Sequence, residues 1–113
     1  MYQNVPYKRV FVTIDLDAIV FNMESMKQNI KPGTEMMGVV KADGYGHGAV
    51  PVAKTMDPYV WGYAAATSEE ALQLRSHGIT KPVLVLSPVH PSEFQELIQE
   101  GIRITVFTRD QAE

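Results

Sequence analysis

Short apolar runs alternate along this chain with stretches in which apolar residues recur at helical spacing. The runs rich in β-branched or aromatic residues are RVFVTIDL (9–16), EMMGVVKA (35–42), VWGYAAAT (60–67), PVLVLSPV (82–89) and IRITVFT (102–108). Each has the composition and length of a β-strand, and the fourth is continuously apolar, as expected of a strand buried on both faces. Strands that alternate with helices predict βαβ units and a parallel sheet, so the expected fold class is α/β.

The segments between the first three runs carry helix signals. Asp17 is positioned to cap a helix that follows the first run, and the segment KPGT (31–34) is expected to end it. The inward face of that helix consists of apolar residues at helical spacing, namely Ile19, Met23, Met26 and Ile30. A second, shorter helix is expected at about Ala49–Met56, with Val50 and Ala53 facing inward.

Two further helices begin with the spacing of a capping box. Thr67 and Glu70 have this spacing and open a helix that is expected to end at Gly78. The segment Ser92–Gln95 repeats the spacing and opens a helix that is expected to end at Gly101. The inward residues of this last helix are expected to be Phe94, Leu97 and Ile98.

The final residues carry the signal of yet another helix start. The segment Thr108–Gln111 has capping-box spacing after a strand, and two residues follow it. We therefore expect the chain to be the front part of a longer protein. Counted from the run that ends at Lys41, it holds about four βα repeats, or half of a (β/α)₈ barrel of about 250 residues. An open doubly wound sheet is the other arrangement that the alternation allows.

Composition excludes several classes of function. The 113 residues carry a net charge of −3 and no basic run, so neither a nucleic-acid site nor a membrane-surface site is expected. No apolar run approaches the roughly 20 residues that span a bilayer, and the N-terminus lacks the apolar core of a signal peptide. The absence of cysteine excludes disulfides and fits a reducing compartment. We expect a soluble, cytoplasmic protein with no metal site, because His47, His77 and His90 lack metal-ligand spacing.

The segment GVVKADGYGHG (38–48) places a lysine at the end of an apolar run and follows it with a glycine-rich turn, which Asp43 is expected to organise. In one interpretation Lys41 simply reaches solvent. In a second, the turn brings backbone N–H groups to a phosphate, although its glycine spacing matches neither a dinucleotide fingerprint nor a Walker loop. In a third, Lys41 is a nucleophilic amine at the carboxyl end of a parallel strand, where it forms a Schiff base with a phosphate-bearing aldehyde such as pyridoxal phosphate.

The sequence VVKADGYGHG (39–48) resembles the pyridoxal-phosphate attachment motif of the alanine racemases without a gap. The resemblance covers nearly all of the chain. Its other parts are VTIDLDAI (12–19), ATSEEALQLRSHGITKPVLVLSP (66–88) and RITVFT (103–108). It implies the fold of that family: an N-terminal (β/α)₈ barrel followed by a β-rich domain.

The resemblance also implies how the chain divides. The strand before the motif is the first barrel strand in the family, so the opening strand, 9–16, is expected outside the barrel. Residues 1–16 would then associate with the β-rich domain, which the chain lacks, and residues 17–113 would form the first half of the barrel.

The resemblance assigns expected roles to individual residues. Lys41 matches the lysine that binds the cofactor and serves as one of two catalytic bases. Tyr45 matches the tyrosine whose hydroxyl contacts the cofactor phosphate. Leu86 matches a leucine near the cofactor ring, and plain core packing is an equal alternative for it. Trp61 and Tyr63 are expected to pack the barrel rather than touch substrate.

The implied function is pyridoxal-phosphate-dependent interconversion of L- and D-alanine, which supplies D-alanine for peptidoglycan. The family takes its second base, a tyrosine, from the other subunit of a homodimer, so this chain alone is expected to be inactive. Within the same fold, the alternative is a racemase for serine or for a broader set of amino acids. The alternatives of another class are a non-catalytic cofactor-binding or interaction module, and a domain that binds an unrelated phosphate ligand through the glycine-rich turn.

Overall fold

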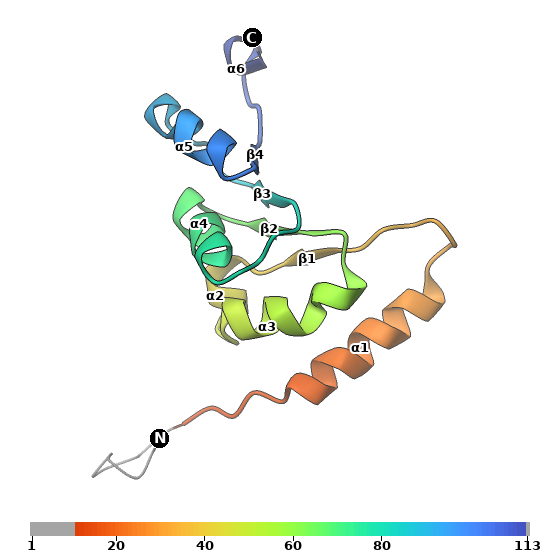
Figure 1. Ribbon diagram of the computed structural model, residues 1–113. Helices are drawn as coiled ribbons and strands as arrows, with labels where there is room; N and C mark the ends of the chain where they lie inside the picture. The colour runs from red at the N-terminus through yellow and green to blue at the C-terminus, as the bar shows by residue number, and fades with distance from the viewer. Residues whose placement is uncertain (1–10, 113) are drawn as a thin grey trace, which may run out of the picture.

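The structure is a computed structural model that describes residues 11–112, and it shows strands alternating with helices (Figure 1). The strands are β1 (Met37–Val39), β2 (Gly62–Ala65), β3 (Val83–Val85) and β4 (Ile102–Ile104). The longer helices are α1 (Leu16–Asn29), α3 (Ala49–Met56), α4 (Ser68–Ser76) and α5 (Phe94–Gln99). The short helical segments are α2 (Lys41–Tyr45), η2 (Asp57–Tyr59), η3 (Pro91–Glu93) and α6 (Arg109–Ala112).

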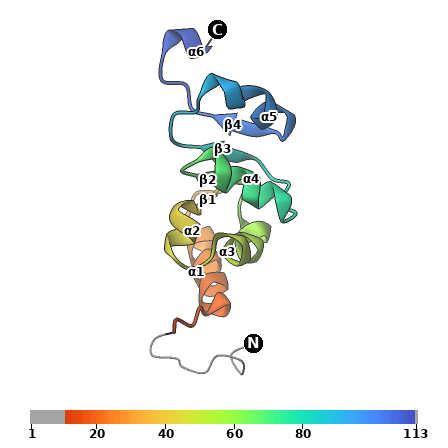
Figure 2. The same ribbon diagram turned by 90° about the vertical axis from the view of Figure 1, so that its left-hand side faces the viewer.

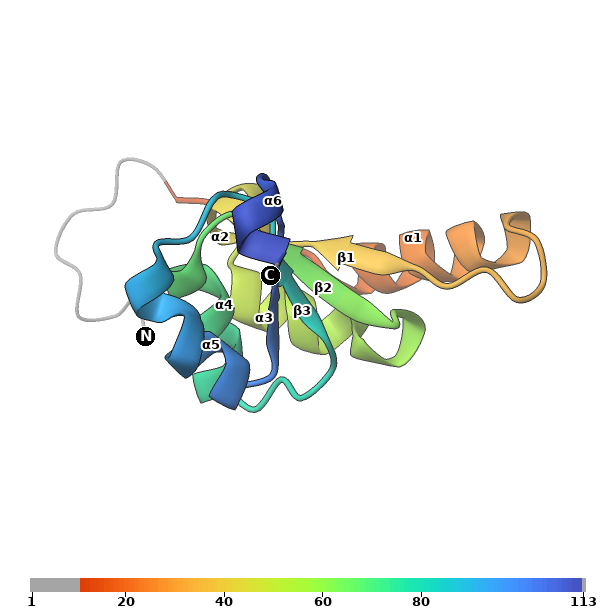
Figure 3. The ribbon, with the colours of Figure 1, turned by 90° about the horizontal axis from the view of Figure 1, so that it is seen from above.

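The strands form one parallel sheet whose order, β1-β2-β3-β4, follows the chain. A doubly wound sheet reverses its strand order at a switch point, and no reversal occurs among these strands. Figures 2 and 3 show α3, α4 and α5 on the same side of the sheet. The predicted α/β fold, with the first repeats of a (β/α)₈ barrel, is therefore confirmed, although each strand is shorter than the run that predicted it.

The core lies between the sheet and these helices. Tyr63 and Val83 point from the strands toward the helices and are fully buried, as are Leu74 of α4 and Leu97 of α5. The opposite face of the sheet is open, and on it Val39 is 41% exposed. In a closed barrel this open face becomes the inner wall.

Two partly exposed cations, Arg75 and Lys81, bind backbone carbonyls between the elements. The Arg75 guanidinium donates to the carbonyls of Ile79, Lys81, Glu100 and Gly101, and so joins the turn after α4 to the turn before β4. The Lys81 ammonium in turn donates to the carbonyls of Asp57 and Val60. These contacts fix the amino ends of β2, β3 and β4 relative to one another.

Two predicted capping boxes are confirmed. At α4, Glu70 N–H donates to Thr67 Oγ1 while the Glu70 carboxylate accepts from Thr67 N–H. At α6, Thr108 and Gln111 exchange the same pair of bonds. Both boxes depend on residues three apart in the chain, which is why the sequence alone predicts them.

Other predicted helix details were wrong. Asp15, not Asp17, caps α1, because the extended residue before the first turn is Asp15, whose Oδ1 accepts from Ala18 N–H. The box predicted at Ser92–Gln95 is absent, because a 3₁₀ turn precedes α5 and is capped by the His90 side chain and Glu93. Ile98 was expected to face inward, yet it is 70% exposed, while its neighbour Leu97 is fully buried.

The described residues of the opening strand predicted at 9–16 are not part of the sheet. Arg9 and Val10 lie outside the described residues, residues 11–15 have no strand structure, and Leu16 already begins α1. A strand requires a partner for its backbone groups, and β1 pairs only with β2 among residues 11–112. The expected association of residues 1–16 with a β-rich domain stays a prediction.

The described helices give no sign of a bilayer-spanning segment. Within residues 11–112, no helix combines the length and the apolar character needed to cross a membrane.

Candidate functional site

The site begins where β1 and β3 end. Val40 N–H donates to Ala64 O at 2.9 Å, and Leu86 N–H donates to Ala65 O at 2.8 Å, so the ladder continues just past the strands. Lys41 follows directly after Val40. Lys41 and Leu86 therefore lie at the same carboxyl edge of the sheet. Lys41 follows β1 and Leu86 follows β3, and the axes of these two strands are about 10 Å apart because β2 lies between them. This edge is where parallel α/β folds place their chemistry.

The chain leaves β1 through a left-handed turn. Ala42, Asp43 and Gly44 have (φ, ψ) of (52°, 48°), (55°, 44°) and (65°, 40°), and Tyr45 has φ 57°. Left-handed helical backbone costs about 1–2 kcal/mol for each residue other than glycine. Aspartate tolerates this region better than most residues, whereas alanine has no side chain to support it. The glycine-rich sequence predicts a turn here, but not a run of left-handed residues.

Hydrogen bonds within the turn hold this conformation. Gly44 N–H donates to Val40 O, and Gly46 N–H donates to Ala42 O. Asp43 contributes twice, since its carbonyl accepts from Gly48 N–H at 2.8 Å and its Oδ1 accepts from Ala49 N–H at 2.9 Å. The prediction that Asp43 organises the turn is confirmed, because it ties the turn to the first residue of α3.

The phosphate-cradle interpretation of the glycines was wrong. A cradle needs backbone N–H groups that point outward to an anion. The groups of the turn instead donate to acceptors in the protein, namely those of Gly44, Gly46, His47, Gly48 and Ala49. Gly44 serves close packing, because it is buried and a Cβ there would lie 3.3 Å from the Ala49 Cα.

The left-handed turn brings Tyr45 back to Lys41. One turn separates the two residues, and the Lys41 Nζ lies 5.9 Å from the centre of the Tyr45 ring, within the range of a cation–π contact. Lys41 is partly exposed and Tyr45 is 60% exposed, so both functional groups are accessible. The pair combines a primary amine with a phenol hydroxyl at the open edge of the sheet.

Leu86 lies on the open face of the sheet. It is 39% exposed and follows Leu84 at the spacing of side chains on one face of a strand. Of its two predicted positions, plain core packing and the neighbourhood of the site, the open face favours the second. Tyr63 is fully buried and so packs the core as predicted, and Trp61 is 40% exposed with the Arg103 guanidinium 5.0 Å from its ring.

Sequence reasoning missed a contact between this turn and α4. The Glu70 Oε2 accepts from Ala42 N–H at 2.8 Å, while Oε1 accepts from Ala66 N–H at 2.7 Å. The capping-box spacing identified Glu70 only as a helix cap. The residues in contact are 28 positions apart, and no local pattern signals such a pair.

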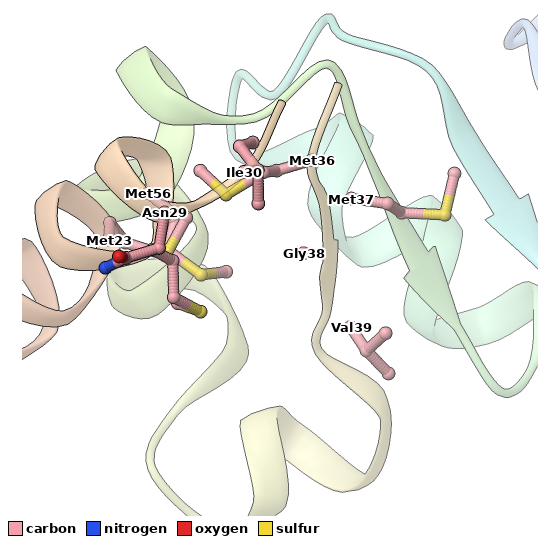
Figure 4. Close-up of a pocket in the computed structure, with 9 residues that line it drawn as sticks. Met23, Asn29, Ile30, Met36, Met37, Gly38, Val39 and Met56 are labelled. Atoms are coloured by element: carbon pink, nitrogen blue, oxygen red, sulfur yellow. The ribbon is translucent and has the colours of Figure 1, made fainter. Parts of the chain in front are cut away.

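A methionine-rich groove of about 500 Å³ lies beside β1, between α1 and the strand (Figure 4). Met23, Met36 and Met56 line it together with Gly38 and Val39, and neither Lys41 nor Leu86 does. Within residues 11–112, no group of three or more His, Asp or Glu side chains is arranged to hold a metal ion.

A buried phenol anchors the sheet to α3 away from the site. The Tyr63 hydroxyl lies 2.6 Å from both Ala53 O and the Asp57 Oδ1. Burial of the phenol raises the pKa of Tyr63 well above its ordinary value, and the hydrogen bond to Asp57 is the second largest cause. The phenol therefore stays protonated and serves structure rather than acid–base chemistry.

Comparisons with known proteins agree with the resemblance seen in the motif. A family model described as "Alanine racemase, N-terminal domain" matches residues 14–113. The chain is 44% identical over 108 residues to alanine racemase 2 of Oceanobacillus iheyensis, and the alignment covers 95% of this chain and 28% of that protein. The chain thus spans less than a third of the length of this relative.

Solved structures share the fold. The alanine racemase of Bacillus anthracis with bound L-Ala-P has a TM-score of 0.86 and 39% identity, covering 94% of this chain and 28% of that one. The histidine racemase of Leuconostoc mesenteroides has a TM-score of 0.83 and 25% identity, covering 96% and 29%. By its sequence, its parallel sheet and the family model that spans residues 14–113, the chain belongs to the alanine racemase family.

Proposed function

We propose that this chain supplies the N-terminal part of the active site of a pyridoxal-phosphate-dependent alanine racemase, which interconverts L- and D-alanine. The observation that carries the proposal is the position of Lys41. Its amine stands at the carboxyl edge of a parallel sheet, beside the Tyr45 ring, in a chain of the alanine racemase family.

The residues at this edge fit the cofactor. Pyridoxal phosphate has an aldehyde, a phosphate and an apolar ring face, and the edge offers a partner for each: the Lys41 amine, the Tyr45 hydroxyl and the Leu86 side chain. Tyr45 and Leu86 are exposed enough to make contact, at 60% and 39%. The N–H groups of Gly44, Gly46, His47, Gly48 and Ala49 are already bonded within the protein, so we assign the phosphate contact of this turn to the Tyr45 hydroxyl.

The chemistry divides between the cofactor and the protein. When bound, the cofactor supplies the electron sink that makes the Cα–H of an amino acid acidic. In this proposal Lys41 would hold the cofactor through its amine, and the same amine would remove or return the proton on one face of Cα. The Tyr45 hydroxyl would bind the phosphate, and Leu86 would contact the ring.

Racemisation needs a second base on the opposite face of Cα. Residues 11–112 leave the inner face of the sheet open and the outer edges of β1 and β4 unpaired, so the layer around Lys41 is incomplete within them. We propose that a homodimer completes it, with a tyrosine from the β-rich domain of the second subunit as the other base. We further propose a cytoplasmic enzyme whose D-alanine goes to peptidoglycan.

The choice of amino acid is a separate question. The histidine racemase of Leuconostoc mesenteroides shares this fold at 25% identity, so the fold alone does not fix the substrate. A serine or broad-specificity racemase is therefore the second candidate. Turnover of alanine, serine, lysine and histidine by the full-length protein separates these possibilities, and we expect alanine to be fastest.

The test of the proposed function is racemase activity of the full-length protein with Lys41→Ala, compared with Lys54→Ala. Lys54 is an exposed lysine on α3, away from the carboxyl edge, so its loss should leave activity unchanged. We expect Lys41→Ala to abolish activity. An active Lys41→Ala protein would refute the proposal. A protein that binds pyridoxal phosphate without racemising any amino acid would instead indicate a non-catalytic cofactor-binding module.

A further inference from the structure

Glu70 joins the first turn of α4 to the turn that follows Lys41. Its two carboxylate oxygens accept from different segments. Oε1 accepts from Ala66 N–H at 2.7 Å and from Thr67 N–H at 3.2 Å, and Oε2 accepts from Ala42 N–H at 2.8 Å. A carboxylate that accepts from backbone N–H groups makes charge-assisted bonds, which are the stronger kind. The position at a helix N-terminus further favours its negative charge.

Ala42 is a left-handed residue whose own side chain gives the turn no support. Asp43 bonds its own turn through Oδ1, and Gly44 adopts positive φ without a steric cost. Ala42 has neither advantage, and yet it begins the left-handed run with φ 52° directly after Lys41. Strained backbone of this kind persists when surrounding contacts hold it. The Glu70 carboxylate supplies such a contact, from an element 28 residues away.

We propose that Glu70 is a positioning residue for Lys41. The Glu70 carboxylate accepts from Ala42 N–H and so stabilises the left-handed turn. The turn then sets the direction of the Lys41 side chain at the end of β1 and places Tyr45 beside it. This inference rests on the proposed role of Lys41 as the cofactor-binding lysine. It gives Glu70 a second role beyond capping α4.

Two substitutions separate the roles. Glutamine keeps the shape of Glu70 and is itself a capping-box residue, but its amide has a single oxygen. The single oxygen satisfies two donors if it faces Ala66 N–H and Thr67 N–H, and only one if it faces Ala42 N–H. We therefore expect it to stay with the capping box, so that Ala42 N–H meets the NH₂ group instead of an acceptor. Thr67→Val is the matched control, because it removes the other half of the capping box and leaves the bond to Ala42 in place.

The first measurement is amide hydrogen exchange at Ala42 in the full-length protein without cofactor. We expect Glu70→Gln to speed exchange at Ala42 at least about tenfold, the loss expected for one charge-assisted hydrogen bond. Thr67→Val should leave Ala42 exchange within about twofold of wild type. Unchanged exchange at Ala42 in Glu70→Gln would overturn the proposal, whatever the protein binds.

The second measurement is the rate at which bound pyridoxal phosphate leaves the protein, followed by its absorbance and set against the melting temperature. For the same loss of melting temperature, we expect cofactor release to be about tenfold faster than wild type in Glu70→Gln and to change less than twofold in Thr67→Val. Adding Ala42→Gly to Glu70→Gln should restore much of the retention, because glycine adopts the left-handed turn without support. Release that tracks the melting temperature in both single variants would mean that Glu70 acts only as a cap.

Failure of this inference is distinguishable from failure of the proposed function. If the cofactor attaches to another lysine, the proposed function fails, while Ala42 exchange still reports whether Glu70 holds the turn. Should Glu70→Gln not fold, Glu70→Asp tests the same bond, because it keeps the charge and lacks the reach. We expect Glu70→Asp to speed Ala42 exchange and cofactor release in the same direction, and no change in either would overturn the proposal.

Discussion

Lys41 and Tyr45 lie together across one left-handed turn, with the lysine Nζ 5.9 Å from the centre of the tyrosine ring. Residues four apart are neighbours on a right-handed turn as well, but such a turn would leave β1 in a different direction. The left-handed backbone of Ala42–Tyr45 therefore sets where the pair lies relative to the sheet. It places the two groups that we assign to the cofactor's aldehyde and phosphate within one short segment.

Tyr45→Phe tests the proposed phosphate contact. The substitution keeps the ring that faces Lys41 and removes only the hydroxyl, which belongs to a side chain that is 60% exposed. We expect the affinity of the full-length protein for pyridoxal phosphate to fall about tenfold, as for the loss of one hydrogen bond to a charged group. Thermal stability of the cofactor-free protein should be unchanged. An unaltered affinity in a cofactor titration would show that the hydroxyl does not bind the phosphate.

Gly44→Ala tests the packing of the turn. Gly44 has φ 65°, and a Cβ there would lie 3.3 Å from the Ala49 Cα. We expect a loss of about 2–5 kcal/mol in the free energy of unfolding, since backbone strain and overpacking combine. Gly46→Ala is the matched control, because Gly46 has φ 86° with nothing within 4 Å of the new Cβ. It should lose only the strain, about 1–2 kcal/mol. Urea unfolding that gives equal losses would contradict the packing argument.

Tyr63 makes stability fall at alkaline pH. Its pKa is raised in the folded state, so folding favours the protonated phenol. The stabilisation is complete below the unfolded pKa of about 10 and is lost as pH rises above it, at about 1.4 kcal/mol per pH unit. Tyr63→Phe should lower stability at pH 8 by about 1–3 kcal/mol, because Ala53 O and Asp57 lose their donor. It should also remove this part of the alkaline slope. Unfolding curves between pH 8 and 11 measure both, and an unchanged slope would contradict the account.

Sequence reasoning succeeded where the determining interactions are local. The alternation of apolar runs predicted the parallel strands, and residues three apart predicted the boxes at Thr67 and Thr108. The same approach failed for the cap of α5, because a 3₁₀ turn at His90 shifts the start of the helix. Residues 11–15 alternate in the same way but have no strand structure here, because a strand needs a partner strand for its backbone groups.

The site shows the same division. Lys41 was predicted at the end of a strand, and the structure places it there. The left-handed turn was not predicted, because alanine does not favour positive φ. The hydrogen bond that Ala42 N–H makes comes from Glu70 on α4, far along the chain. The glycines suggested a phosphate cradle, yet their N–H groups are used within the turn. Spacing reveals which residues are near in the chain, and the roles of backbone groups depend on contacts that spacing does not show.

The central claim is that Lys41 is the residue to which pyridoxal phosphate attaches. Borohydride reduction of the full-length protein loaded with the cofactor makes that attachment permanent, and mass spectrometry of its peptides then locates the label. We predict a label on Lys41 and on no other lysine of residues 1–113. A label on a different lysine, with Lys41 unmodified, would contradict the account.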